Sequence, residues 1–160
     1  MKDYCNRPID YLRLSVTDRC NLRCIYCMPA EGIEKRSHDD ILSYEDIVRV
    51  CRAFAEAGVR KIKITGGEPL VRRGVAGLVK ALKKQPGIDV VTMTTNGILL
   101  AGQADSLREA GLDGINISLD ALDPDLYRVL TRGGDVRDAL AGIDAALACG
   151  FPAVKINCVP

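Results

Sequence analysis

The sequence lacks the features that mark a membrane protein, a nucleic-acid-binding protein or a disordered chain. No apolar run is long enough to cross a bilayer, and the first residues, MKDYCNRPIDYLR, are too polar for a secretory signal. The formal net charge is only +1, so no overall charge attracts a nucleic-acid polymer or a membrane surface. No linker rich in proline, glycine or serine divides the chain. With 48% hydrophobic residues, the sequence predicts one globular domain, residues 1–160.

Cysteine is plentiful by contrast, with seven in the chain. In a chain without an export signal, clustered thiols indicate metal or redox chemistry in a reducing compartment, so we expect a cytoplasmic protein. The only cluster lies in CNLRCIYC, where three and then two residues separate Cys20, Cys24 and Cys27. Cys51 and Cys149 lie in helical patterns and are expected to be small core residues.

Three neighbouring thiolates suit neither a disulfide, which pairs two, nor a structural zinc site, which takes four protein ligands. Soft sulfur ligands select iron–sulfur clusters or zinc. Three cysteines on a four-iron cluster would leave one iron able to bind a small molecule. The zinc alternative requires His38 as a fourth ligand, although its loop, KRSHDD, is typical of an exposed segment. Cys20, Cys24 and Cys27 therefore predict a [4Fe–4S] cluster, with zinc as the alternative.

Strand and helix patterns alternate along the chain. Apolar or β-branched segments predict strands at residues 11–16, 61–65, 90–95, 114–120 and 153–159. Helical patterns lie between them, at residues 43–58, around 75–82, around 101–110, from Asp123-Pro124 onward, and up to Gly150. A polar loop from Asp18 to about Leu42 contains the clustered cysteines. This alternation predicts an α/β fold with parallel strands joined by crossover helices.

In two of these predicted helices, the spacing of the apolar residues defines the face that is expected to be buried. Ser43 and Asp46 form a capping-box pattern at the start of the first helix. Its apolar face consists of Ile47, Val50, Cys51 and Phe54. The face of the last helix consists of Val136, Leu140, Ile143 and Leu147. We expect both faces to pack on the sheet.

Unusual polar residues follow successive strands. GGEP (66–69) follows the second strand, TNG (95–97) ends the third, SLD (118–120) ends the fourth, and Lys155 and Asn157 lie on the fifth. Each motif alone fits a turn or a helix cap. Sites in α/β proteins form at the carboxyl ends of parallel strands, however, so the shared position predicts one functional site there.

The spacing Cys20-x3-Cys24-x2-Cys27, with Tyr26 before the last cysteine, resembles the signature of the radical S-adenosylmethionine (SAM) superfamily, and GGEP resembles its glycine-rich motif. Longer stretches resemble the GTP 3′,8-cyclase family, which catalyses the first step of molybdenum-cofactor biosynthesis. These stretches are YLRLSVTDRCNLRCIYCMPAEG, ITGGEPLVRRG, TTNGILL, SLDALDP and VKIN, and they cover nearly the whole chain. The resemblance implies an incomplete parallel (β/α) barrel of the radical SAM type.

The resemblance also implies the roles of individual residues. Cys20, Cys24 and Cys27 would hold a [4Fe–4S] cluster whose open iron chelates SAM. The residues that would contact SAM or shape its pocket are Tyr26, Gly66, Gly67, Glu68 and Ser118. The residues that would contact GTP are Arg13, Lys63, Thr94 and Lys155. No side chain is assigned as catalytic, because the cluster and SAM carry the chemistry.

Elementary chemistry agrees with these roles. Glycines let a backbone approach closely, and the carboxylate of Glu68 suits the ammonium group of SAM. Arg13 and Lys63 interrupt otherwise apolar strands, where a charge normally needs a partner. Arg72 and Arg73 are interpreted equally well as phosphate contacts or as surface charge.

In the reaction that the resemblance implies, one-electron reduction cleaves SAM to methionine and a 5′-deoxyadenosyl radical, which takes the 3′ hydrogen of GTP. The C3′ radical then attacks C8 of guanine and gives 3′,8-cyclo-7,8-dihydro-GTP after reduction and proton transfer. The partners would be GTP and an electron donor resembling flavodoxin or ferredoxin, and a homo-oligomer is also allowed. The alternatives are a radical SAM enzyme with another substrate and a non-catalytic iron–sulfur or zinc-binding module.

The end of the sequence departs from the family pattern. Family members have a second half with further cysteines that bind a second cluster, and the sequence has no such set. It stops at KINCVP, the end of a predicted strand, which would leave a parallel edge uncovered. We therefore expect residues 1–160 to be the N-terminal half of a longer enzyme.

Overall fold

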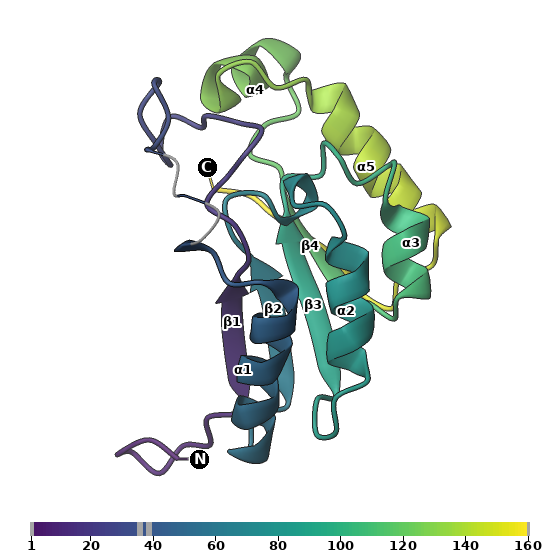
Figure 1. Cartoon of the computed structure of the whole chain (residues 1–160). Helices are drawn as coiled ribbons and strands as arrows, with labels where there is room; N and C mark the ends of the chain where they lie inside the picture. The colour runs from purple at the N-terminus through teal and green to yellow at the C-terminus, as the bar shows by residue number, and fades with distance from the viewer. Residues whose placement is uncertain (1, 35–36, 38–39, 160) are drawn as a thin grey trace.

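A five-stranded parallel sheet forms the centre of the computed structural model, which describes residues 2–34, 37 and 40–159 (Figure 1). The strands are β1 (Tyr11–Ser15), β2 (Lys61–Thr65), β3 (Val90–Thr95), β4 (Gly114–Ser118) and β5 (Val154–Asn157). Their order in the sheet is their order in the chain, and every neighbouring pair is parallel. The predicted strands and the predicted incomplete parallel barrel are confirmed.

Helices cover one face of this sheet. They are α1 (Tyr44–Glu56), α2 (Val75–Lys83), α3 (Ala104–Glu109) and α5 (Val136–Ala148), whereas α4 (Pro124–Thr131) lies beyond the ends of the strands (Figure 1). The helix predicted around 101–110 is shorter than expected, and a 3-10 turn, η2 (Pro69–Val71), was not expected at all. Among the described residues, no helix combines the length and the apolar character that crossing a membrane requires.

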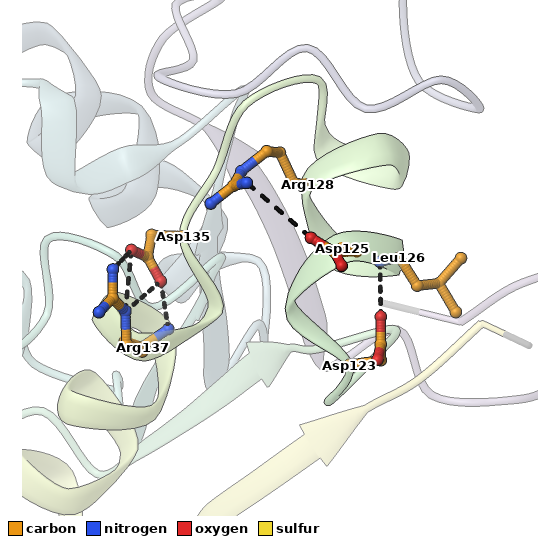
Figure 2. A network of polar contacts seen from close by, with 6 residues as sticks. All are labelled: Asp123, Asp125, Leu126, Arg128, Asp135 and Arg137. Atoms are coloured by element: carbon orange, nitrogen blue, oxygen red, sulfur yellow. Dashed lines mark hydrogen bonds and ion pairs between the residues drawn. The ribbon is translucent and has the colours of Figure 1, made fainter.

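Three helices begin at a capping side chain. Ser43 caps α1 as predicted, Asp123 caps α4 and Asp135 caps α5. The amides that donate to them are those of Asp46 (3.0 Å), Leu126 (2.8 Å) and Arg137 (2.9 Å), respectively. Figure 2 shows the caps of α4 and α5. These oxygens satisfy amides that have no partner inside the helix, which fixes where each helix starts.

The main core lies between the sheet and the helices. Alternate strand residues point into it and are fully buried: Ile62, Ile64, Val91, Met93, Ile115 and Ile117. Because side chains alternate across a strand, the residues between them face the other side of the sheet. That other face carries the polar strand residues that were predicted to contact the substrate.

The predicted apolar face of α5 is wrong in part. Leu140 and Leu147 are exposed by 36% and 60%, and the buried side of the helix consists of Val136, Ala139, Gly142 and Ala146. The reason is a close approach of the helix to the loop after β3. A Cβ atom on Gly142 would overlap the carbonyl oxygen of Gly97, so only small residues fit on this side.

The cysteine and α1 predictions are confirmed in part. Cys51 is fully buried in the core, together with Ile47. Val50 and Phe54 of the same helix are, however, exposed by 39% and 37%. Cys149 is only partly buried at the end of α5.

Candidate functional site

The predicted site residues gather at the carboxyl ends of the strands. The cysteine loop, defined as residues 18–34, follows β1, and the GGEP segment follows β2. Ser118 ends β4 and pairs in register with Asn157 of β5. Figure 1 shows the cysteine loop and α4 together beyond these strand ends. The separate motifs therefore lie at one edge of the sheet, as the sequence predicts.

The two glycines of GGEP let this segment lie directly against the start of the cysteine loop. The amide of Gly67 donates to the carbonyl of Thr17, and the amide of Glu68 donates to that of Arg19, both at 2.8 Å. Gly66 has a φ of 153°, and a Cβ on Gly67 would overlap the carbonyl of Arg19. Glycine is needed here for close backbone approach.

Replacing Gly67 with alanine should therefore destabilise the fold. The added methyl must displace backbone atoms, and overpacking of this kind costs about 1–3 kcal/mol of unfolding free energy. Urea unfolding of the variant measures this. Gly102→Ala is the matched control, because nothing lies within 4 Å of its Cβ position. Equal stability of the two variants would contradict the close approach.

Glu68 is held inside the protein. It is 1% exposed, and its Oε1 accepts from the amide of Leu70 (3.0 Å) and the hydroxyl of Thr95 (2.8 Å). Its Oε2 accepts from the amide of Asn96 at 2.7 Å. Burial raises the pKa of this carboxyl, and the three donors oppose the rise. Glu68 thus ties the loops after β2 and β3 together, and its contact with an ammonium group remains a prediction.

The cysteine loop presents three free thiols. Cys20 and Cys24 are partly buried and Cys27 is exposed. The carbonyl of Cys24 accepts from the amides of Cys27 (2.9 Å) and Met28 (3.2 Å), which closes a turn between the second and third cysteines. Burial raises the pKa values of the Cys20 and Cys24 thiols, and the neighbouring thiols act in the same direction. Metal coordination would offset both effects, since a coordinated thiol is deprotonated.

The donor set of this loop fits an iron–sulfur cluster. All three candidate ligands are sulfur, and the amide of Leu22 lies 3.4 Å from the Sγ of Cys20, as a donor to a cluster thiolate would. The hydroxyl of Tyr127 is buried and lacks a hydrogen-bond partner among the residues described. Burial, and then the nearby Cys24, raises the pKa of Tyr127 to about 12. Tyr127 thus has a buried hydroxyl that can still donate a hydrogen bond.

The same residues fit a single metal ion less well than they fit a cluster. Within residues 2–34, 37 and 40–159, no three Cys, His, Asp or Glu side chains converge on a point where one ion could bind. A zinc ion requires such convergence, whereas each thiolate of a [4Fe–4S] cluster binds its own iron. His38, the fourth ligand in the zinc alternative, lies outside the described residues.

Tyr26 connects the cysteine loop to the sheet. Its hydroxyl donates to Oδ2 of Asp120 at 2.5 Å, and Oδ1 of Asp120 accepts from the amide of Val159 at 2.9 Å. Burial and the bond to Asp120 raise the pKa of Tyr26. The SLD motif that contains Asp120 was predicted to lie at the functional end of the sheet, but its link to Tyr26 was not predicted. The position of Asp120 directly after a strand, in the SLD motif, was the available signal.

Arg13, Lys63 and Lys155 form a cationic group on the face that the helices leave uncovered. Arg13 and Lys63 are register partners on β1 and β2, and Thr94 and Lys155 each pair with Asn116 of β4. None of the three cations has a hydrogen bond or ion pair with another described residue. Burial, and then the charges of Lys155 and Arg13, lower the pKa of Lys63.

Lys63 and Lys155 lie on β2 and β5, with β3 and β4 between them. Strands three positions apart in a sheet are separated by about 14 Å, a distance that two long lysine side chains can span between them.

Arg72 is a structural residue rather than a free phosphate contact. Its guanidinium donates to the carbonyls of Val16 and Leu42, both at 2.7 Å, and lies 4.2 Å from the ring centre of Tyr44. Arg73 remains exposed and lines a cavity of about 480 Å³ together with Arg72.

Comparison with known sequences agrees with this geometry. Residues 14–160 match the family model described as the radical SAM superfamily. The GTP 3′,8-cyclase of Petrotoga mobilis is 54% identical over 99% of this chain and 49% of that protein. The GTP 3′,8-cyclase of Geobacter sulfurreducens is 55% identical over 98% of this chain and 48% of that protein. The chain thus spans about half the length of the curated relatives it matches.

Solved structures show the same fold. SuiB of Streptococcus suis, bound to its precursor peptide SuiA, superposes with a TM-score of 0.77 over 93% of this chain and 32% of that chain, at 23% identity. Methylornithine synthase superposes with a TM-score of 0.72 over 91% of this chain and 43% of that chain, at 20% identity. From its family match, its cysteine loop and its open parallel sheet, the chain belongs to the radical SAM superfamily, whose enzymes use a [4Fe–4S] cluster and SAM.

Proposed function

We propose that this chain is the radical SAM core domain of a GTP 3′,8-cyclase. The observation that carries the substrate is the unpaired group of Arg13, Lys63 and Lys155 on the face of the sheet that the helices leave uncovered. Identities of 54% and 55% to proteins of that name, over nearly the whole chain, support the same substrate. A protein of net charge +1 attracts a polyanion only through such a local concentration of cations.

The cofactor side of the proposed site is the cysteine loop. Cys20, Cys24 and Cys27 would hold the [4Fe–4S] cluster, which supplies the electron for reductive cleavage of SAM when it is bound. The residues proposed to contact SAM or shape its pocket are Tyr26, Gly66, Gly67, Glu68 and Ser118. Of these, Glu68 would act by holding two loops in place, because its oxygens already accept three hydrogen bonds.

The substrate side is the cationic group with Thr94. A triphosphate would neutralise charges that repel one another in the free protein, and charge-assisted contacts to phosphate are strong and directional. Arg13 can form two parallel hydrogen bonds to phosphate, while the two lysines act as point charges. Thr94 lies two residues closer to the strand end than Thr92, the register partner of Lys63, and its hydroxyl would contact the same molecule.

The remaining assignments belong to the same proposal. An electron donor resembling flavodoxin or ferredoxin would reduce the cluster. The free cysteines of the chain suit a reducing, cytoplasmic location.

Turnover tests the proposal. The complete protein is reconstituted anaerobically with iron and sulfide, reduced, and incubated with SAM and either GTP or ATP, and the products are separated by chromatography. We expect the cyclised nucleotide to form in the reaction with GTP and not in the reaction with ATP. Cleavage of SAM without consumption of GTP would indicate a radical SAM enzyme with another substrate. A cluster without SAM cleavage would indicate a non-catalytic module.

A further inference from the structure

The end of α4 is joined to the cysteine loop through the backbone. The amide of Arg23 donates to the carbonyl of Thr131 at 3.1 Å, and the amide of Ile25 donates to that of Leu130 at 2.9 Å. These carbonyls belong to the last turn of the helix and have no acceptor role inside it. The cysteine loop therefore uses the C-terminal end of α4 as a fixed edge.

Arg132 adds a side-chain contact at the same place. Its Nη1 donates to the carbonyl of Arg23 at 3.0 Å and to the carbonyl of Met28 at 2.7 Å. Residues 23 and 28 flank the turn from Cys24 to Cys27, which carries two of the three proposed ligands. One guanidinium thus holds both ends of this turn.

The backbone of Arg132 makes this contact unusual. The residue ends α4 in the left-handed conformation, with φ 53° and ψ 54°. Glycine is the residue that ordinarily occupies such a position, because the backbone of most other residues, apart from Asn and Asp, is strained there. Glycine would end the helix with less strain, whereas only a long side chain can reach the two carbonyls of the cysteine loop. Backbone strain retained at a site is a reason to look for function.

We propose that Arg132 is a positioning residue that holds the Cys24–Cys27 turn in the geometry that cluster binding needs. Ligands fixed before the metal group arrives lose less conformational freedom on binding it, so the group is held more tightly. The inference rests on the proposed function, since it requires Cys24 and Cys27 to be ligands. It adds a residue outside the cysteine, SAM and GTP contacts.

The test separates cluster retention from fold stability. Arg132→Gly removes both carbonyl contacts and at the same time relieves the left-handed backbone. Before reconstitution, the relief of backbone strain opposes the loss of two hydrogen bonds and the greater freedom of glycine in the unfolded chain, so its unfolding temperature should change little. After reconstitution, it should lose iron to a chelator on the order of 10-fold faster, as expected when hydrogen bonds from a charged group are removed. The electron paramagnetic resonance signal of its reduced cluster should also broaden.

Two further variants sharpen the result. Arg132→Lys keeps the charge but lacks the planar fork, so its rate of iron loss should be intermediate. Arg128→Gln removes the same charge from α4. Figure 2 shows Arg128 directed at Asp125, 3.9 Å away, and the described contacts do not link its side chain to the cysteine loop. This control should lose iron at the unsubstituted rate.

Three outcomes would overturn the inference. Iron loss from Arg132→Gly and Arg132→Lys at the unsubstituted rate would show that the contact does not hold the turn. Iron loss that follows a parallel fall in unfolding temperature would show a purely structural role. If the unsubstituted protein binds no cluster at all, the proposed function fails first and this inference fails with it.

Discussion

Replacing any one of Cys20, Cys24 or Cys27 with alanine is expected to abolish the [4Fe–4S] cluster and with it the cleavage of SAM. Each thiolate would bind a different iron, so no remaining cysteine can take over the position of the missing one. The groups in contact with the Cys20 thiol cannot compensate, because they are the amide of Leu22 and the side-chain amides of Asn21 and Asn96, none of which is a thiolate. Iron and sulfide per chain after anaerobic reconstitution measure the loss.

Cys51→Ala is the matched control for this experiment. Cys51 belongs to the buried side of α1 and is fully buried in the core. Its substitution should lower the unfolding free energy by about 1 kcal/mol, the typical effect of a point change, and leave the iron content unaltered. If Cys51→Ala loses the cluster while Cys24→Ala keeps it, the ligand assignment is wrong.

Lys63→Ala and Lys155→Ala should each weaken the binding of GTP by about 1–3 kcal/mol, as expected for the loss of a charge-assisted contact. Affinity for SAM should barely change. Calorimetry with the complete protein measures both. Lys80→Ala is the control, because Lys80 lies on α2, on the opposite side of the sheet. Unaltered GTP affinity in both strand variants would remove these residues from the substrate site.

Lys63→Ala should not destabilise the protein in the absence of nucleotide. Burial and the like charges of Lys155 and Arg13 lower the pKa of Lys63, which means that the folded state disfavours its charged form. This penalty is present wherever the lysine is charged in the fold and disappears as the pH rises past its ordinary value. Removing Lys63 therefore relieves repulsion at neutral pH. A gain or no change in unfolding temperature, combined with weaker GTP binding, would distinguish a functional charge from a structural one.

The position of the candidate site could be predicted from the sequence because its signals are local. The spacing of Cys20, Cys24 and Cys27 lies within one short loop, and the polar motifs directly follow apolar strands. Parallel strands bring such motifs to one edge without any knowledge of side-chain packing. Arg13 and Lys63 could be recognised as candidate site residues because they interrupt apolar strands.

The features that were missed depend on contacts between distant segments. Asp120 contacts Tyr26 from a position 94 residues away in the chain, and Arg132 reaches carbonyls more than 100 residues away. No local pattern encodes these distances. The error in α5 has a similar origin, because a close approach at Gly142 buries small residues where periodicity favoured leucines.

The claim that the cysteine loop and the cationic face form one radical site is tested most directly with GTP that carries deuterium at C3′. The complete, reconstituted protein is incubated anaerobically with this substrate, SAM and a reductant, and the 5′-deoxyadenosine is analysed by mass spectrometry. The proposed site predicts that deuterium from C3′ appears in the 5′-deoxyadenosine. Formation of 5′-deoxyadenosine without deuterium, while GTP remains unchanged, would contradict it.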